Sequence, residues 1–241
     1  MSEDAPNLVV PPPPEEFHAA LRDASIELSP EDLARCTRYL ELLYAANATM
    51  NLTGVRDPGA AWMRHIFDAL TLLPIAAEAG AARIADIGSG GGIPGLVLAC
   101  VLPEAEMILI ESVGKKARFL DETARALELS RVRVRQERAE TLGAKELRES
   151  LDLVVSRAVA RLPALLEYAL PMVRPGGLFV ATKGEQGAAE AAASVHALGE
   201  LRGRLVELRR TPTGTLVIVE KVGRTPKRYP RAAGEPERAP L

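Results

Sequence analysis

The chain has 241 residues, of which 47% are hydrophobic and 26% are charged, and its formal net charge is −2. These values are ordinary for a globular protein and argue against a disordered, collagen-like or disulfide-stapled chain. The near-neutral charge also argues against a domain that binds nucleic acid through bulk positive charge, although it leaves room for local basic clusters.

The sequence also bears on the cellular location of the protein. No apolar run approaches the roughly 18 to 20 residues that cross a bilayer, and the acidic, proline-rich start is unlike a signal peptide. We therefore expect a cytoplasmic protein with no membrane partner. Cys36 and Cys100 lie far apart in sequence, outside any metal-ligand spacing, so we expect buried apolar cysteines and no metal site.

The first third of the chain predicts a leader followed by helices. Residues 1–14 end in PPPP and are expected to be a disordered leader. Residues 15–82 are expected to form a helical segment packed on the main domain. One helix, residues 29–47, begins with Ser29 as N-cap and Pro30 in its first turn. A second helical region, residues 57–80, starts at Asp57 and is kinked or split by Pro74; its Trp62 and Phe67 are core candidates.

From residue 83 the pattern changes to strands that alternate with helices. The strand-like segments are RIADIG, EMILIES, RVRVRQ, LDLVVSRA, GGLFVATKG and, around the turn TPTG, RLVELRRT and TLVIVEKV. Alternation predicts an α/β fold with a doubly wound, mostly parallel sheet of seven strands, and the last two strands predict a terminal antiparallel hairpin. Residues 185–203 are expected to form one alanine-rich helix. The main domain is thus 83–222, and residues 223–241 form a basic tail.

The glycine-rich turn after the first strand is the candidate ligand site. Gly88, Gly90 and Gly92 follow the strand with GxGxG spacing, which lets backbone N–H groups approach a ligand closely. Gly90, Gly92 and Gly95 also match the dinucleotide pattern GxGxxG, which is weak alone. In the register set by the strand, the third glycine of that pattern would fall at position 93, which is isoleucine.

Two carboxylates next to the turn bear on the choice of ligand. Asp86 precedes the glycines, and a fixed anion there would repel pyrophosphate but suit a ligand with ammonium and sulfonium groups, such as S-adenosylmethionine. The alternative for Asp86 is a partner for a helix N-terminus or for a surface group. Glu111 ends the second strand, where a carboxylate accepts hydrogen bonds from ribose hydroxyls in either cofactor class.

Five segments together resemble one known family. They are NLTGVRDPGAAWMRHIFDAL, IADIGSGGGIPGLVLA, LIESVGKKARFLDETARALEL, VVSRAVARLPALLEYALPMVRPGG and RYPRAAGEPERAPL. In order and spacing they resemble the bacterial small-subunit ribosomal RNA methyltransferase G family, also called glucose-inhibited division protein B. The resemblance implies a class I methyltransferase fold and S-adenosylmethionine as cofactor. It also implies N7 methylation of one guanosine in the 530 loop of 16S rRNA, as free rRNA or in the small ribosomal subunit.

The resemblance also implies a set of cofactor-site residues. Gly88 and Ile93 would contact the cofactor, together with Ser89 and the other loop glycines, while Glu111 would bind the ribose. Ala139 and Glu140 would lie beside the adenine, and Arg157 would complete the site. Guanine N7 has an exposed lone pair, so no catalytic base is expected; Asp86 and Arg157 are candidates only for positioning and electrostatics.

Basic residues near the predicted carboxyl edge of the sheet are candidate RNA contacts. We expect a track of phosphate-binding cations, strongest in the tail, because the tail shows no amphipathic period. The candidates are Arg64, His65, Lys115, Lys116, Arg118, Lys183, Arg224, Lys227, Arg228 and Arg231. His65 is equally well interpreted as a packed, hydrogen-bonded residue.

Two other functions stay open at this point. The GxGxxG spacing with Glu111 downstream fits an NAD(P)-dependent oxidoreductase. The basic tail and the lack of an obligatory catalytic side chain fit a non-catalytic RNA-binding protein. We expect the protein to act as a monomer.

Overall fold

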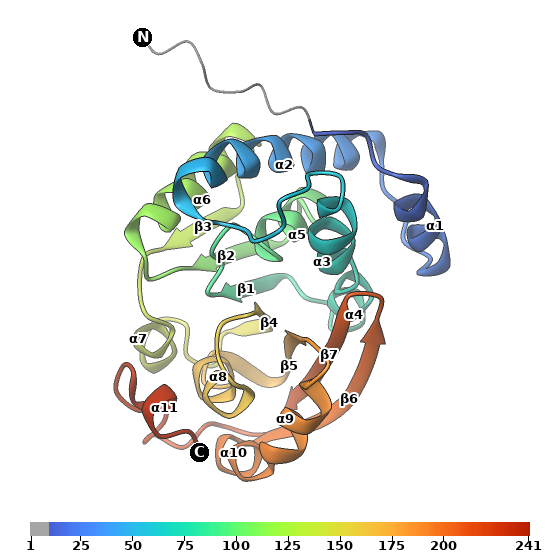
Figure 1. The fold of residues 1–241 in the computed structure, drawn as a ribbon. Helices are drawn as coiled ribbons and strands as arrows, with labels where there is room; N and C mark the ends of the chain where they lie inside the picture. Colours follow the sequence, from blue (N-terminus) through green and yellow to red (C-terminus); the bar gives the residue numbers. More distant parts are fainter. Residues whose placement is uncertain (1–9) are drawn as a thin grey trace.

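A seven-stranded sheet forms the centre of the molecule. In this computed structural model, which describes residues 10–241, the strand order is β3-β2-β1-β4-β5-β7-β6 (Figure 1). β1 to β5 run parallel to one another, whereas β7 is antiparallel to both β5 and β6. The predicted mostly parallel sheet and terminal antiparallel hairpin are therefore confirmed. The strands are β1 (Arg83–Ile87), β2 (Glu106–Ile110), β3 (Val132–Arg135), β4 (Leu151–Arg157), β5 (Val173–Lys183), β6 (Gly203–Thr211) and β7 (Gly214–Lys221).

The order of the parallel strands reverses beside β1. The chain proceeds from β1 outward to β2 and β3, and then returns to place β4 on the other side of β1. In an open α/β sheet, such a reversal leaves a crevice outside the carboxyl ends of the strands, where ligands bind. The topology therefore directs attention to the loops that follow β1, β2 and β4.

Helices cover both faces of the sheet (Figure 1). On one face, a hydrophobic cluster joins the N-terminal helices, α5 and α6 to sheet residues such as Ile84 and Leu109. On the other, Ala85 and Ile108 pack with α8 and α10. The helices are α1 (Glu15–Asp23), α2 (Pro30–Met50), the π-helix η1 (Trp62–Phe67), α3 (Asp68–Leu70), α4 (Leu73–Glu78), α5 (Gly95–Val101), α6 (Gly114–Ala126), α7 (Ala139–Ala144), α8 (Leu162–Ala169), α9 (Gly187–Ala193), α10 (Val195–Leu201) and α11 (Glu235–Arg238).

The N-terminal helices follow the sequence signals with one difference. Ser29 caps α2 through a capping box with Asp32, as its position before Pro30 predicts. The second helical region begins at Trp62 rather than at Asp57, because the Asp57 carboxylate accepts the N–H of Gly59 at 2.9 Å and forms a turn instead. Pro74 lies in the first turn of α4, so it splits the region as expected.

The core contains the residues that the sequence assigned to it. The side chains of Trp62 and Phe67 are 0% and 2% exposed, and Cys36 and Cys100 are both fully buried. Cys36 belongs to α2 and Cys100 to α5, two helices that pack together over the sheet. Among residues 10–241, none of the helices is both long and apolar enough to cross a membrane.

Two expectations are wrong. Val10 is only 6% exposed, and the carbonyl of Pro11 accepts the indole N–H of Trp62 at 2.9 Å, so Val10 and Pro11 are packed against the helical segment. The rest of the expected disordered leader, residues 1–9, lies outside the described residues. The alanine-rich helix is broken into α9 and α10 at Ser194, whose hydroxyl donates to the carbonyl of Glu190 at 2.7 Å.

The packing of Val10 generates a stability prediction. Because Val10→Ala removes two buried methyl groups, we expect it to lower the free energy of unfolding by about 1–2 kcal/mol. Val195→Ala, at a side chain that is 69% exposed, is the matched control and should change it by less than about 0.5 kcal/mol. Urea unfolding measures both values. Equal effects of the two substitutions would show that Val10 is not packed.

Candidate functional site

A cleft opens where the carboxyl ends of β1, β2 and β4 meet. Its floor is formed by the ends of β1 and β2, and its sides by the segments before α7 and after β4. Tyr168 on α8 and Glu237 on α11 close the remaining side. The lining residues are Ile87, Gly88, Ile110, Glu111, Ser112, Glu137, Arg138, Ala139, Glu140, Val159, Ala160, Tyr168 and Glu237.

The glycine turn needs backbone conformations that other residues rarely adopt. Gly88, Gly90 and Gly92 have φ angles of 68°, 54° and 94°. The N–H groups of Gly88 and Ser89 donate to the carbonyl of Ile110 at 2.8 and 3.1 Å, so the turn is anchored to the end of β2. A Cβ on Gly88 would lie 2.4 Å from a methyl carbon of Val159. The turn is therefore closely covered by the loop that follows β4.

Glu111 connects the glycine turn to the next helix. One carboxylate oxygen accepts the N–H of Gly90 at 3.0 Å, and the other accepts the N–H of Val113 at 2.7 Å. The side chain is buried except where it lines the cleft. Each carboxylate oxygen has a second lone pair, so Glu111 retains acceptor capacity for a hydroxyl pair on a ligand.

Asp86 does not face the cleft, which corrects the electrostatic role expected for it. Its side chain is 0% exposed, and it lies on the opposite face of β1 from Ile87, which lines the cleft. One of its carboxylate oxygens accepts the N–H of Gly95 at 3.1 Å, and the other has no hydrogen-bond partner. Burial raises the pKa of Asp86 to about 7. Asp86 thus holds the start of α5, which is the alternative that the sequence left open.

Four carboxylates line the cleft in place of Asp86. They are Glu111, Glu137, Glu140 and Glu237, and Arg138 is the single guanidinium among the lining residues. A cleft with this excess of negative charge repels pyrophosphate and attracts a ligand that carries ammonium and sulfonium groups. The selection expected of Asp86 is therefore supplied by residues along the cleft wall.

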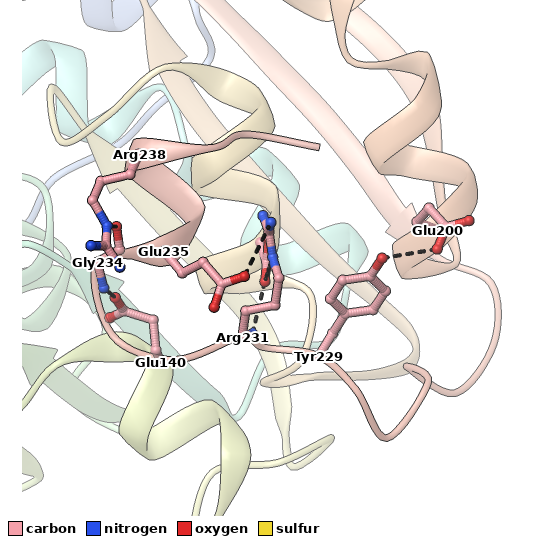
Figure 2. Close-up of polar contacts among 8 residues, drawn as sticks. Glu140, Glu200, Tyr229, Arg231, Gly234, Glu235 and Arg238 are labelled. Carbon is pink, nitrogen blue, oxygen red and sulfur yellow. Dashed lines mark hydrogen bonds and ion pairs between the residues drawn. The ribbon is translucent and has the colours of Figure 1, made fainter.

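The wall beside α7 and α8 combines an acceptor with a donor. Glu140 is 5% exposed, and its Oε1 accepts the N–H of Gly234 at 2.8 Å (Figure 2). Burial raises the pKa of Tyr168 to about 12, and the nearby charges of Glu140 and Glu237 contribute to the same shift. Tyr168 is therefore protonated at neutral pH and available as a donor.

Arg157 lies behind the cleft wall rather than in it. Its guanidinium is 3.0 Å from the carboxylate of Asp68 on α3, and the hydroxyl of Thr213 in the β6–β7 turn donates to the same carboxylate. The three side chains thereby connect the helical segment, β4 and the terminal hairpin. Sequence reasoning placed Arg157 in the cofactor site but missed its buried partner Asp68.

His65 is a packed residue, so its assignment as an RNA contact is wrong. The side chain is 3% exposed; Nδ1 donates to the carbonyl of Arg64 at 2.9 Å, and Nε2 accepts the hydroxyl of Thr53 at 2.7 Å. Burial, reinforced by the Arg157 charge, lowers the pKa of His65 to about 4. A neutral imidazole without solvent access provides no cation for a phosphate.

Two further RNA candidates have protein partners instead. Lys183 donates to the carbonyl of Ala160 at 2.6 Å, lies 3.0 Å from Glu190 and has a side chain only 10% exposed, so it fastens the loop after β4. Arg231 binds the buried carboxylate of Glu167 through its guanidinium and its backbone N–H. Their charges are compensated inside the fold, which contradicts their assignment to an RNA track.

The start of the tail lies at the wrong edge of the sheet for an RNA track. Arg224 and Lys227 are exposed, but they flank Thr225, whose N–H donates to Glu149 at the amino end of β4. Arg228 is exposed too, and it pairs with Glu200 on α10. These three cations are therefore remote from the cleft, contrary to the expectation that the basic candidates gather at the carboxyl edge of the sheet.

The remaining basic candidates keep a surface position. Lys115 and Arg118 line a shallow groove at the start of α6, directly after the cleft residues Glu111 and Ser112. Arg64 is exposed on η1, and Lys116 is half-buried. Among the described residues, none of these four side chains makes an ion pair with an acidic side chain.

The structure brings together only part of the predicted cofactor set. Gly88, Glu111, Ala139 and Glu140 line the cleft. The other residues of the predicted set do not line it: Ser89, Gly90, Gly92 and Ile93 in and after the turn, and Asp86 and Arg157. Position after a strand end was an available signal for Ser112, Glu137, Arg138, Val159 and Ala160, which sequence reasoning missed. Tyr168 and Glu237 had no such signal, because tertiary packing alone brings them to the cleft.

Comparison of the sequence with known proteins gives consistent matches. A model of the family described as rRNA small subunit methyltransferase G matches residues 32–208. The ribosomal RNA small subunit methyltransferase G of Sorangium cellulosum is 44% identical over 219 residues, covering 90% of this chain and 92% of that protein. The protein of the same name from Desulfitobacterium hafniense is 38% identical over 224 residues, with the same coverage of 90% and 92%.

Solved structures agree with the observed fold. The O-methyltransferase from Bacillus cereus, in complex with SAH, has a TM-score of 0.59 at 19% identity and covers 87% of this chain and 99% of its own. The O-methyltransferase TomG from Streptomyces achromogenes, in complex with SAM, has a TM-score of 0.58 at 18% identity and covers 87% and 98%. This likeness shows that the chain has the methyltransferase fold predicted from its sequence.

The buried carboxyl of Asp86 generates a pH prediction. Its folded-state pKa of about 7 exceeds the ordinary value of 3.8, so the folded chain binds more protons between these values. This group therefore lowers the free energy of unfolding as the pH rises from about 4 to about 7. Asp86→Asn keeps an acceptor for Gly95 but removes the titration, so the free energy of unfolding measured in urea should fall less between pH 5 and pH 8 than in the wild type.

The control for that comparison is Asp23→Asn, which removes one exposed carboxylate and should keep the wild-type pH dependence. If Asp86→Asn shows the same change between pH 5 and pH 8 as the wild type, Asp86 does not titrate in this range.

Proposed function

The chain belongs to the rRNA small subunit methyltransferase G family, and from this premise we propose that it methylates N7 of one guanosine in the 530 loop of 16S rRNA. As a member of this family it is an rRNA methyltransferase that uses S-adenosylmethionine. The proposal concerns the position of the methyl group, the residues that hold the cofactor and the surface that meets the RNA.

One observation supports the cofactor position best: the cleft joins a glycine turn to a wall rich in carboxylates. In our proposal the methionine end lies against Gly88 and the ribose hydroxyls bind Glu111. The adenine lies beside Ala139 and Glu140. Oε2 of Glu140 can accept a hydrogen bond from the exocyclic amino group of the adenine, because Oε1 already accepts the N–H of Gly234. Asp86 and Arg157 act from beneath, by supporting α5 and the end of β4.

The acidic wall also weighs against an oxidoreductase. Pyrophosphate in this cleft would lie near four glutamates and only one arginine, and this excess of negative charge would repel it. Gly95, the last glycine of the dinucleotide pattern, packs closely against Leu109 and Asp86, and this helix–strand packing role does not distinguish the two cofactor classes. Together with the family membership, the excess of negative charge leaves no support for an NAD(P) enzyme.

The chemistry asks little of individual side chains. Bound S-adenosylmethionine supplies an electrophilic methyl group, and guanine N7 attacks it with an exposed lone pair. The chain needs to hold N7 in line with the methyl group and to exclude competing geometries. Because N7-methylguanine is cationic, the carboxylates of the cleft wall would stabilise the charge that develops on the base.

The surface beside the cleft suits a phosphate backbone. Lys115 and Arg118 face solvent next to the cleft, and Arg64 and Lys116 add positive charge from η1 and α6. Contacts of this kind position an RNA loop while the target base is turned into the site. We further propose a monomeric enzyme that acts in the cytoplasm, where its rRNA substrate is found.

The direct test is methyl transfer by the purified protein. Incubation with labelled S-adenosylmethionine and small subunits or rRNA that lack the modification should label one guanosine, and mass mapping should locate the methyl group at N7 in the 530 loop. A label at another nucleotide would refute the proposed position. RNA binding without any transfer, in every assembly state, would instead favour the non-catalytic RNA-binding protein.

A substitution in the glycine turn tests whether this turn binds the cofactor. Gly88→Ala places a Cβ against Val159 at a φ of 68°, so it should disturb the turn and reduce cofactor affinity by at least about tenfold. Gly199→Ala is the control, because a Cβ there meets nothing within 4 Å and Gly199 lies in α10, away from the cleft. Calorimetric titration with S-adenosylmethionine measures both, and unchanged affinity in Gly88→Ala would contradict the assignment of this turn.

A further inference from the structure

The C-terminal segment, residues 223–241, runs from the amino ends of the strands to the cleft at their carboxyl ends. It starts at the amino end of β4, where the N–H of Thr225 donates to Glu149 at 2.7 Å. It ends beside α7 and α8, with α11 next to them in the ribbon (Figure 1), and Glu237 reaches the cleft. The segment expected to be a basic tail is therefore a strap across the outside of α8.

Arg231 fastens the middle of this strap. Its backbone N–H donates to Glu167 at 2.8 Å, and its guanidinium binds both oxygens of the same carboxylate at distances from 2.6 to 3.1 Å. Figure 2 shows the arginine directed inward and also turned toward Glu235, 3.7 Å away. Glu167 is 0% exposed, so the paired contacts with Arg231 are buried against α8. Arg148 adds a second anchor by donating to the carbonyl of Tyr229 at 2.8 Å.

Beyond Arg231 the strap becomes part of the cleft wall. Three residues later, Gly234 donates its N–H to Glu140 Oε1, and a further three residues along, Glu237 lines the cleft together with Tyr168. With Oε1 occupied by the strap, Glu140 presents Oε2 as its acceptor for a ligand. Loss of the strap would leave the Glu140 carboxylate without this fixed orientation.

We propose that residues 231–238 belong to the cofactor site, with Glu237 as a wall of the adenine subsite and Arg231 as a positioning residue. Arg231 acts through the strap: its pairing with Glu167 places Gly234 against Glu140 and Glu237 at the cleft. The inference rests on the proposed function, because it takes the ligand of the cleft to be the adenosine part of S-adenosylmethionine.

The test measures S-adenosylmethionine binding by calorimetry and steady-state kinetics with the full-length protein. Arg231→Ala should weaken cofactor binding by at least about tenfold, because the strap loses its buried anchor. Its KM for the cofactor should rise while its kcat and its KM for RNA stay near wild type, a split that a general loss of structure would not produce. Arg231→Lys, which keeps the charge but not the paired contacts, should restore part of the affinity.

The matched control is Arg228→Ala. It removes one arginine from the same strap, but Arg228 pairs with Glu200 at the exposed surface of α10, away from the cleft. Its cofactor affinity should stay within about twofold of wild type. If Arg228→Ala weakens binding as much as Arg231→Ala, or if Arg231→Ala binds as wild type does, the inference is wrong.

A second variant decides the question if Arg231→Ala does not fold. Glu237 is exposed at the cleft mouth and makes no contact that the fold needs, so Glu237→Ala should fold normally and weaken cofactor binding about threefold or more. Wild-type affinity in this variant would overturn the inference. Failure of the wild-type protein itself to bind S-adenosylmethionine would contradict the proposed function instead, so the two failures are distinguishable.

Discussion

The carboxylate of Glu111 is the contact on which the site depends most. It accepts the N–H of Gly90 in the glycine turn and the N–H of Val113 before α6, and it also lines the cleft. The turn also requires three glycines with positive φ, and the topology requires that β1 and β2 end side by side. These constraints leave a crevice at the carboxyl ends of the strands, and its lining carries four carboxylates and one guanidinium. A ligand with ammonium and sulfonium groups fits that electrostatic environment.

Local signals in the sequence predicted most of the fold and the centre of the site. Apolar runs located the strands, Ser29 and Pro30 located the start of α2, and the glycine spacing located the turn. The orientation of Asp86 was not predictable in the same way. A central parallel strand is apolar on both faces, so alternation does not reveal which residues face the ligand. The structure assigns Ile87 to the cleft and Asp86 to α5.

Long-range pairing accounts for the errors among the charged residues. Arg231 binds Glu167, which is 64 residues away in sequence, and Arg157 pairs with Asp68 on the helical segment. Nothing local distinguishes such an arginine from one that meets RNA. For the same reason the sequence separated the basic tail from the cofactor site, whereas Gly234 and Glu237 bring the two together. Lys115 and Arg118 remain predicted RNA contacts, and both line the groove at the start of α6.

A crystal structure of the protein with bound S-adenosylhomocysteine tests the central claim most directly. The account predicts the ribose hydroxyls on Glu111, the adenine between Glu140 and Tyr168 under the C-terminal strap, and the thioether beside Gly88. Density for the ligand anywhere else, or a cleft that holds it with the adenine directed away from the strap, would contradict the account.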